Sequence, residues 1–122
     1  MTNEIDLKRR TKQFALRIIK LVNALPKNST GRIIGNQLVR CGTSVAANYR
    51  AACRGRSKVE FISKLGVVIE EADESMFWLE VIIESSLMRQ ELVHPLLKEA
   101  DEITAIMVAS RKSASKNKEN KI

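Results

Sequence analysis

The sequence has 122 residues, a hydrophobic content of 44% and a formal net charge of +7 at pH 7. A chain of this length suits one domain with its own core, and its apolar runs fall short of the roughly 18 residues that a membrane-spanning helix needs. The opening MTNEIDLKRR lacks the apolar segment of a secretory signal, so we expect a cytoplasmic protein whose basic charge favours an anionic partner, either nucleic acid or an acidic membrane surface.

The first expected helix covers residues 4–24 and carries a large share of the positive charge. Its apolar residues recur at helical spacing until Pro26 interrupts the pattern. The same helix carries six cations, which are Lys8, Arg9, Arg10, Lys12, Arg17 and Lys20. These cations form either a solvated basic face or part of a surface for an anionic ligand.

The second expected helix begins near Ser29 or Thr30, either of which is a suitable N-cap. Small residues around Gly42 indicate that a neighbouring helix approaches closely. The expected buried line is Ile34, Leu38, Cys41, Val45, Asn48 and Ala52. Because Cys41 and Cys53 are twelve residues apart, about 18 Å along one helix, they are beyond disulfide reach and are expected as reduced thiols.

The stretch CRGRSKVEF, residues 53–61, connects the second helix to the third. Gly55 suits the left-handed position that ends a helix, and Ser57 with Glu60 matches a capping box for the next one. Cations also stabilise the negative end of a helix dipole, so the corner has a structural explanation. The alternative is a phosphate-binding surface formed by the four cations of this region, Arg50, Arg54, Arg56 and Lys58.

The third expected helix has the most regular apolar spacing in the chain. One heptad seam consists of Ile62, Leu65, Ile69, Ala72, Met76, Leu79, Ile83 and Ser86, and a second line consists of Phe61, Val68, Ala72, Ser75, Leu79 and Ile82. Two adjacent lines make a face wide enough for the interior of a bundle. Residues 65–88 contain six acids and no lysine or arginine. Phe77 and Trp78 lie partly off the seam, which indicates either a subunit contact or packing against another helix.

The fourth expected helix carries Leu96, Ala100, Ile103, Met107 and Ser110 at the same spacing, with Pro95 in its first turn. Short linkers between long helices favour antiparallel neighbours. The sequence therefore predicts an all-α, up-down-up-down four-helix bundle over residues 1–112. Residues 113–122 are rich in Ser, Asn and Lys and are expected to form a disordered basic tail.

Catalytic chemistry is poorly supported by this sequence. His94 is the only histidine, and Glu91 with His94 matches just half of the paired Glu-x-x-His motif that holds two metals in a bundle. We therefore expect no metal, no cofactor and no enzymatic activity. In the acidic run of residues 70–74, Glu71 and Glu74 share one helical face. They form either an acid/base pair or, as we favour, a bridge to Arg40 within or between subunits.

Polar and apolar residues along the middle of the chain follow the order and spacing of a known family. The matching positions are Gln37, Leu38, Arg40, Ser44, Val45, Ala47, Asn48, Arg54, Ser57, Lys58, Phe61, Leu65, Glu74, Trp78, Leu79 and Glu80. With these residues the chain resembles bacterial four-helix bundle proteins related to those encoded in intervening sequences of large-subunit ribosomal RNA genes. The likeness extends over nearly the whole chain.

The resemblance implies an antiparallel bundle that assembles as a ring-shaped homo-oligomer, with a homopentamer as the expected form. It also implies distant kinship with the accessory protein of diversity-generating retroelements, which binds nucleic acid and works with a reverse transcriptase. By matching position, the shared polar residues are Arg40, Asn48, Arg54 and Glu74. We favour a structural network of Arg40, Asn48, Glu71 and Glu74 buried between helices over a role in a groove or a ring interface.

Two hypotheses follow for function. The first is a non-enzymatic, oligomeric protein that contacts the backbone of RNA or DNA without sequence preference, through Lys8, Arg9, Arg10, Arg50, Arg54, Arg56 and Lys58. The second is a protein-interaction scaffold whose charge asymmetry serves its own assembly. A reverse transcriptase or another protein is a further candidate partner, and no membrane partner is expected.

Overall fold

A computed structural model describes the backbone of residues 3–119 and the side chains of residues 3–116. It contains four helices, α1 (Glu4–Asn23), α2 (Ser29–Cys53), α3 (Lys58–Glu84) and α4 (Gln90–Glu119), and no strand within that range. The predicted all-α fold with four helices is therefore confirmed. Across residues 3–119, none of these helices combines the length and the apolar composition needed to cross a membrane.

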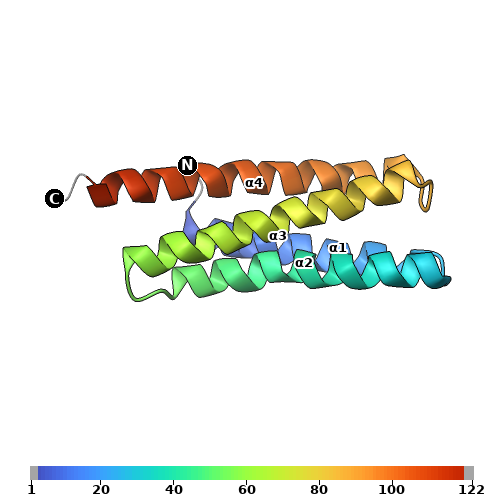
Figure 1. Ribbon diagram of the computed structural model, residues 1–122, viewed down its shortest axis with the longest axis horizontal. Helices are drawn as coiled ribbons and strands as arrows, with labels where there is room; N and C mark the ends of the chain where they lie inside the picture. Colours follow the sequence, from blue (N-terminus) through green and yellow to red (C-terminus); the bar gives the residue numbers. More distant parts are fainter. Residues whose placement is uncertain (1–2, 120–122) are drawn as a thin grey trace.

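The helices pack in chain order, α1 on α2, α2 on α3 and α3 on α4. The connections α1–α2 and α3–α4 lie at one end of the molecule, whereas the α2–α3 corner lies at the other end, together with the start of α1 and the end of α4 (Figure 1). Contact between α1 and α4 is the smallest of the four helix contacts.

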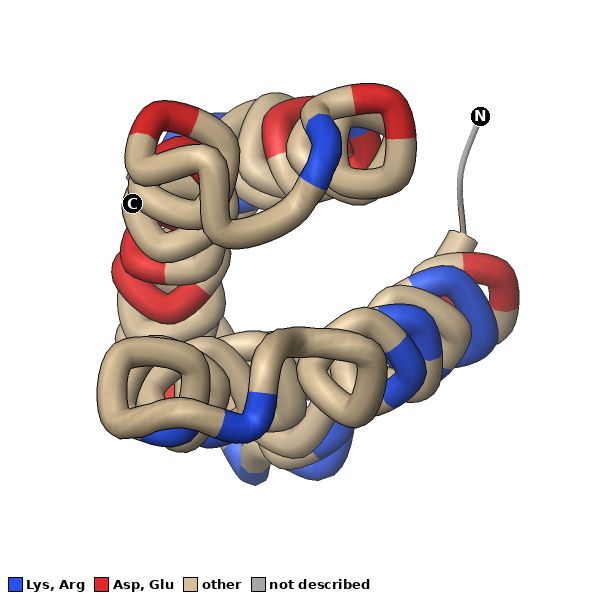
Figure 2. Tube along the Cα trace, turned by 90° about the vertical axis from the view of Figure 1, so that its right-hand side faces the viewer, with Lys and Arg blue, Asp and Glu red and all other residues tan. Residues whose placement is uncertain are grey.

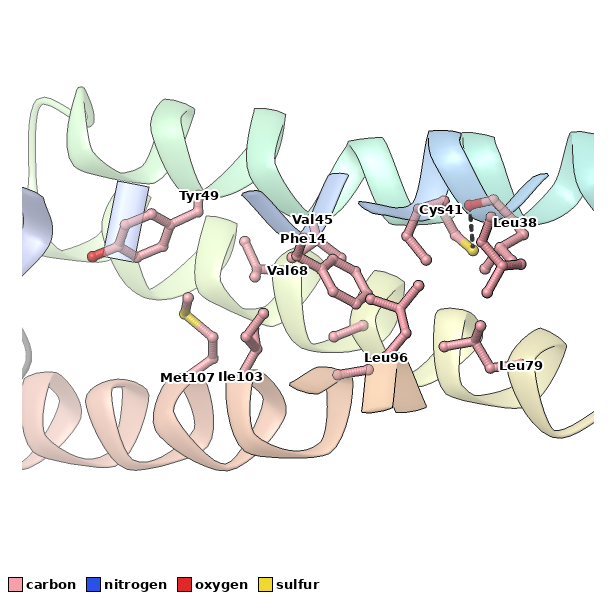
Figure 3. Packing of buried hydrophobic residues seen from close by; sticks show 14 of the residues in the cluster. Phe14, Leu38, Cys41, Val45, Tyr49, Val68, Leu79, Leu96, Ile103 and Met107 are labelled. Atoms are coloured by element: carbon pink, nitrogen blue, oxygen red, sulfur yellow. Dashed lines mark hydrogen bonds between the residues drawn. The ribbon is translucent and has the colours of Figure 1, made fainter. Parts of the chain in front are cut away.

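Apolar side chains from all four helices meet in one core. Among those that are completely or almost completely buried are Phe14 of α1, Tyr49 of α2 and Met107 of α4, which point into the same interior (Figure 3). Two polar side chains are also buried, and each finds a backbone acceptor on its own helix. Thr11 Oγ1 donates to the Leu7 carbonyl at 2.8 Å, and Ser75 Oγ donates to the Glu71 carbonyl at 2.8 Å. Buried hydroxyls satisfied in this way add little desolvation cost to the core.

Two glycines explain the close contact between α1 and α2. A Cβ at Gly42 would lie 2.9 Å from Ile18 Cγ1, and a Cβ at Gly35 would lie 2.9 Å from Val22 Cγ1. Only glycine leaves room for these branched side chains at the observed separation. The close approach predicted around Gly42 is therefore present.

Two expected details of the helix ends differ in the structure. The N-cap of α2 is Asn28, whose side chain accepts from the Gly31 N–H at 2.8 Å, and not Ser29 or Thr30. Gly55 does not have a positive φ, while Ser86 does, with φ of 58°. Ser86 comes just after Ser85, the C-cap of α3, where a left-handed residue allows the chain to leave the helix.

The corner between α2 and α3 contains the predicted cap in a modified form. Ser57 Oγ accepts from the Glu60 N–H at 3.1 Å, as expected for a capping box. The Glu60 carboxylate, however, accepts from the N–H of Arg56, one residue before the cap. Both bonds satisfy donors at the start of α3 and hold the corner in shape.

In α3 the fully buried residues are Leu65 of the first predicted line together with Val68, Ala72, Ser75, Leu79 and Ile82 of the second, whereas Phe61 of the second line is only partly buried. Ile69, Met76 and Ile83 of the first seam pack only partly buried against the core. The helix is thus rotated toward its second line, because it packs against both α2 and α4.

Pro95 lies in the second turn of α4 and not in the first, since α4 already begins at Gln90. This helix also continues to Glu119, so residues 113–119 extend the bundle helix, and the rest of the expected tail, residues 120–122, lies outside the described residues.

Candidate nucleic-acid interface

A basic groove runs along the outside of α1 and α2. Its volume is about 660 Å³, and the described side chains that line it include five cations and no acid. The cations are Lys8, Arg9, Lys12, Arg50 and Arg54, and the floor is Thr43, Ala46 and Ala47. Figure 2 shows the cations of α1 along its outer side, while many of the acids lie on α3 and α4. The charge asymmetry of the sequence is therefore also an asymmetry between sides of the molecule.

Helical spacing brings these cations together. Lys8 and Lys12 are one turn apart on α1, as are Arg50 and Arg54 at the end of α2. The side chains of the floor are small, because Ala46 and Ala47 of α2 lie on the side of the groove where α1 and α2 approach closely. Long cationic side chains above a floor of small residues give an anion access to several charges at once.

The structure divides the seven cations that the sequence suggested as one surface. Lys8, Arg9, Arg50 and Arg54 line the basic groove together. Lys12, which also lines the groove, was named among the cations of the first helix but not among these seven, although it lies four residues after Lys8 on the same helical face. The other three, Arg10, Arg56 and Lys58, lie elsewhere.

Arg10 turns away from the groove and binds α4. Its Nε donates to Glu99 Oε2 at 2.7 Å, and its Nη2 donates to Glu99 Oε1 at 2.8 Å and to Glu102 Oε1 at 2.9 Å. This bidentate geometry is the strong form of an arginine–carboxylate contact. Hydrogen bonding to Glu99 accordingly raises the pKa of Arg10 above its usual value. Arg10 is a structural residue and is not available to a phosphate.

Arg56 and Lys58 line a different hollow at the end of the bundle. This hollow has a volume of about 910 Å³ and lies between the start of α1, the α2–α3 corner and the second half of α4. Phe61 and Ile106 contribute apolar surface to it, and Glu4 places a carboxylate among its lining residues. A mixed, partly apolar lining differs from the uniformly basic groove, so we leave these two cations out of the interface.

The expected polar network forms between α2 and α3, within one chain. Arg40 Nη1 donates to Glu71 Oε2 at 3.2 Å, and Arg40 Nη2 donates to Glu74 Oε2 at 2.6 Å. Trp78 Nε1 also donates to Glu74 Oε2, at 3.2 Å. The hydrogen bond from Arg40 lowers the pKa of Glu74, and the same contact raises the pKa of Arg40.

Two features of this network differ from the expectation. The Arg40 side chain is 51% exposed, so the ion pairs lie at the surface of the α2–α3 contact and are not buried. Asn48 does not join them, because its Nδ2 donates to the Ser44 carbonyl of its own helix at 2.9 Å.

Glu91 and His94, the half-match to a metal-binding motif, are both exposed. No group of three or more potential metal-ligating side chains occurs among the described residues.

Comparison with known proteins agrees with this architecture. The sequence profile of the 23S rRNA-intervening sequence protein family matches residues 3–109. The chain is also similar to a protein of unknown function from the S23 ribosomal protein family of Bacteroides thetaiotaomicron VPI-5482, whose crystal structure superimposes with a TM-score of 0.82. The two sequences are 30% identical over 87% of this chain and 98% of that one. No curated protein matches the chain. With the profile match covering most of its length, the chain belongs to the 23S rRNA-intervening sequence protein family.

Proposed function

We propose that this protein is a non-enzymatic, cytoplasmic accessory protein that binds the phosphate backbone of RNA or DNA without sequence preference. The basic groove is the observation that carries the proposal, because five cations converge there around a floor of small residues, with no acid among the described lining side chains. Cations in such an arrangement replace the counterions of several neighbouring phosphates.

The chemistry of the groove favours backbone contact over base recognition. Its lining contains no aromatic side chain on which an unpaired base would stack. Lysine and arginine at its rim contact phosphates, which carry no sequence information directly. We therefore expect duplex DNA and structured RNA to bind with similar affinity, and the affinity to fall steeply as salt is raised.

Fluorescence anisotropy with labelled duplex DNA and structured RNA across a salt series tests this function. Phosphate contacts by three to five of these cations predict a slope of log K against log salt of roughly −3 to −5 for duplex DNA. The double variant Arg50→Glu and Arg54→Glu should bind at least about tenfold more weakly at low salt and should lose about two units of that slope. A matched control, Lys64→Glu with Lys98→Glu, makes the same change in net charge at exposed positions outside the groove.

Two outcomes decide against the proposal. One is the absence of binding by the folded wild-type protein at low salt. The other is an equal loss of affinity in the groove variant and in the control, which would mean that only net charge matters.

We further propose that the protein acts as a ring-shaped homo-oligomer, with a homopentamer as the expected form and an antiparallel, up-down-up-down order of helices in each copy. Figure 1 supports the helix order, since successive connections alternate between the two ends of the bundle. A reverse transcriptase or another nucleic-acid enzyme is the kind of protein such an accessory factor would assist. The alternative function is a protein-interaction scaffold, and the segregation of charge between sides of the molecule favours it if nucleic acid does not bind.

A further inference from the structure

The outer face of α3 carries acids on both sides of one exposed aromatic ring. Glu70, Asp73, Phe77, Glu80 and Glu84 are all exposed and follow one another by three or four residues. They therefore lie on a single side of the helix, opposite its core line. We name these five residues the acidic stripe. Phe77 is 54% exposed and is flanked by charges of one sign.

Neighbouring side chains hold Phe77 in place. Its ring packs edge-on against Trp78, with 4.9 Å between ring centroids. Trp78 in turn donates to Glu74, which is bound by Arg40 from α2. An exposed aromatic ring that is already ordered loses little conformational entropy when a partner covers it. The α2–α3 ion pairs thus support a rigid apolar contact point.

The outer face of α1 repeats this pattern with the opposite charge. Arg9, Lys12, Leu16 and Lys20 are all exposed, and Leu16 is 54% exposed. We name them the basic stripe. Relative to Leu16 the cations lie at positions −7, −4 and +4, and relative to Phe77 the acids lie at −7, −4, +3 and +7. Each stripe is an apolar residue flanked by charges of one sign, at nearly the same helical spacing.

We propose that the acidic stripe on α3 of one copy docks against the basic stripe on α1 of a second copy. Leu16 would cover Phe77 at the centre, and the flanking cations would meet the flanking acids. Because α1 and α3 do not contact each other within the bundle, both stripes are available to neighbouring copies. The inference deepens the proposed self-association by naming its two surfaces.

This contact joins two different surfaces and is therefore heterologous. Each copy presents one acidic and one basic stripe, so every copy binds two neighbours, and the chain of contacts closes into a ring when the rotation between copies permits. A two-fold dimer, which pairs the same surface on both copies, is not expected. Arg9 and Lys12 belong to both the basic stripe and the basic groove, so a docked neighbour leaves Lys8, Arg50 and Arg54 of the groove for phosphate contact.

Charge reversal on each stripe, followed by sedimentation velocity of the full-length protein, tests the inference. The α3 variant is Glu70→Lys, Asp73→Lys and Glu80→Lys, and the α1 variant is Arg9→Glu, Lys12→Glu and Lys20→Glu. Wild type should sediment as an oligomer of the 13.7 kDa chain, and each triple variant should sediment as a single chain. Combining all six substitutions in one chain restores opposite charges across the contact, so the oligomer should return.

Further variants separate this contact from net charge and from folding. The control Lys64→Glu, Arg89→Glu and Lys98→Glu reverses three exposed cations outside both stripes and should remain oligomeric. Phe77→Ala should weaken self-association about tenfold or more, as expected for a central aromatic contact. Helix content by circular dichroism should match the wild type in every variant, because all the substituted side chains are exposed.

A single-chain mass for the wild-type protein would overturn the proposal, as would oligomers that persist in both triple variants or fail to return in the six-fold variant. These outcomes are distinct from failure of nucleic-acid binding. The variant Arg50→Glu with Arg54→Glu changes the groove without touching either stripe, and it should bind nucleic acid weakly while keeping the oligomer.

Discussion

Arg10 of α1 and Glu99 of α4 form a bidentate ion pair, with 2.7 Å from Nε to Oε2 and 2.8 Å from Nη2 to Oε1. The pair is partly buried, since the side chains of Arg10 and Glu99 are 30% and 18% exposed. It joins the two helices that share the smallest contact in the bundle. An ion pair therefore links α1 and α4, the two helices whose packing against each other is least extensive.

Replacing Arg10 should destabilise the bundle more than replacing its neighbour. Arg10→Ala removes hydrogen bonds to two carboxylates, and we expect a loss of about 1–2 kcal/mol in the free energy of unfolding, measured by urea denaturation. Arg9→Ala removes an exposed cation and should change the free energy of unfolding by less than about 0.5 kcal/mol. Equal midpoints for the two variants would mean that the ion pair adds no net stability.

Alanine at Gly42 should be unfavourable despite its better helix propensity. A Cβ there would lie 2.9 Å from Ile18 Cγ1 and 3.0 Å from Ile18 Cγ2, and Ile18 is completely buried. We expect a loss of about 1–3 kcal/mol in the free energy of unfolding, because the close α1–α2 contact must open.

Gly66 provides the matched control for that substitution. A Cβ at Gly66 would meet only the end of the Arg111 side chain, at 3.4 Å from Nη1, and that side chain is free to move. Gly66→Ala should therefore stabilise the protein by up to about 1 kcal/mol through helix propensity. Stabilisation by both alanines would refute the steric argument at Gly42.

The stability of the α2–α3 contact should depend on pH in a defined direction. The Arg40 hydrogen bond lowers the pKa of Glu74 in the folded protein below its usual value. A lowered folded-state pKa means that the contribution is present above the unfolded-state pKa and is lost as pH falls through the folded-state pKa. Glu74→Gln lacks this titration but keeps an acceptor for Trp78.

The free energies of unfolding of wild type and Glu74→Gln should therefore converge as pH falls from about 6 to about 3. Trp78 fluorescence during urea unfolding is a direct measure, since Trp78 is the only tryptophan and donates to this carboxylate. A difference that stays constant with pH would show that ionised Glu74 adds nothing to stability.

The two thiols should react at very different rates. Cys41 is completely buried, and burial raises its pKa, whereas Cys53 is only half-buried. Burial also raises the pKa of Cys53, so its reaction with a thiol reagent should be slow but measurable in the native state. We expect one thiol to react natively and both to react in denaturant, and Cys53→Ser should abolish the native reaction. Rapid modification of Cys41 would indicate that the core opens readily.

The sequence by itself determined the number and the approximate limits of the helices, and which apolar lines were candidates for the interior. These properties depend on periodicity along a single helix and on local signals such as Pro26, Ser57 and Glu60, which act over a few residues. The close approach at Gly42 was also readable, because only a small residue lets a neighbouring backbone come near. The pairing of Arg40 with Glu71 and Glu74 followed from their shared faces.

Only the tertiary structure decided how each helix is rotated and therefore which charges meet. Arg9 and Arg10 are neighbours in the sequence but point about 100° apart around α1, so one lines the basic groove and the other binds Glu99. The same rotation selects the second apolar line of α3 for the core and leaves Phe77 on the outside. Helix orientation results from the packing of all four apolar faces together, and no segment of sequence contains that information alone.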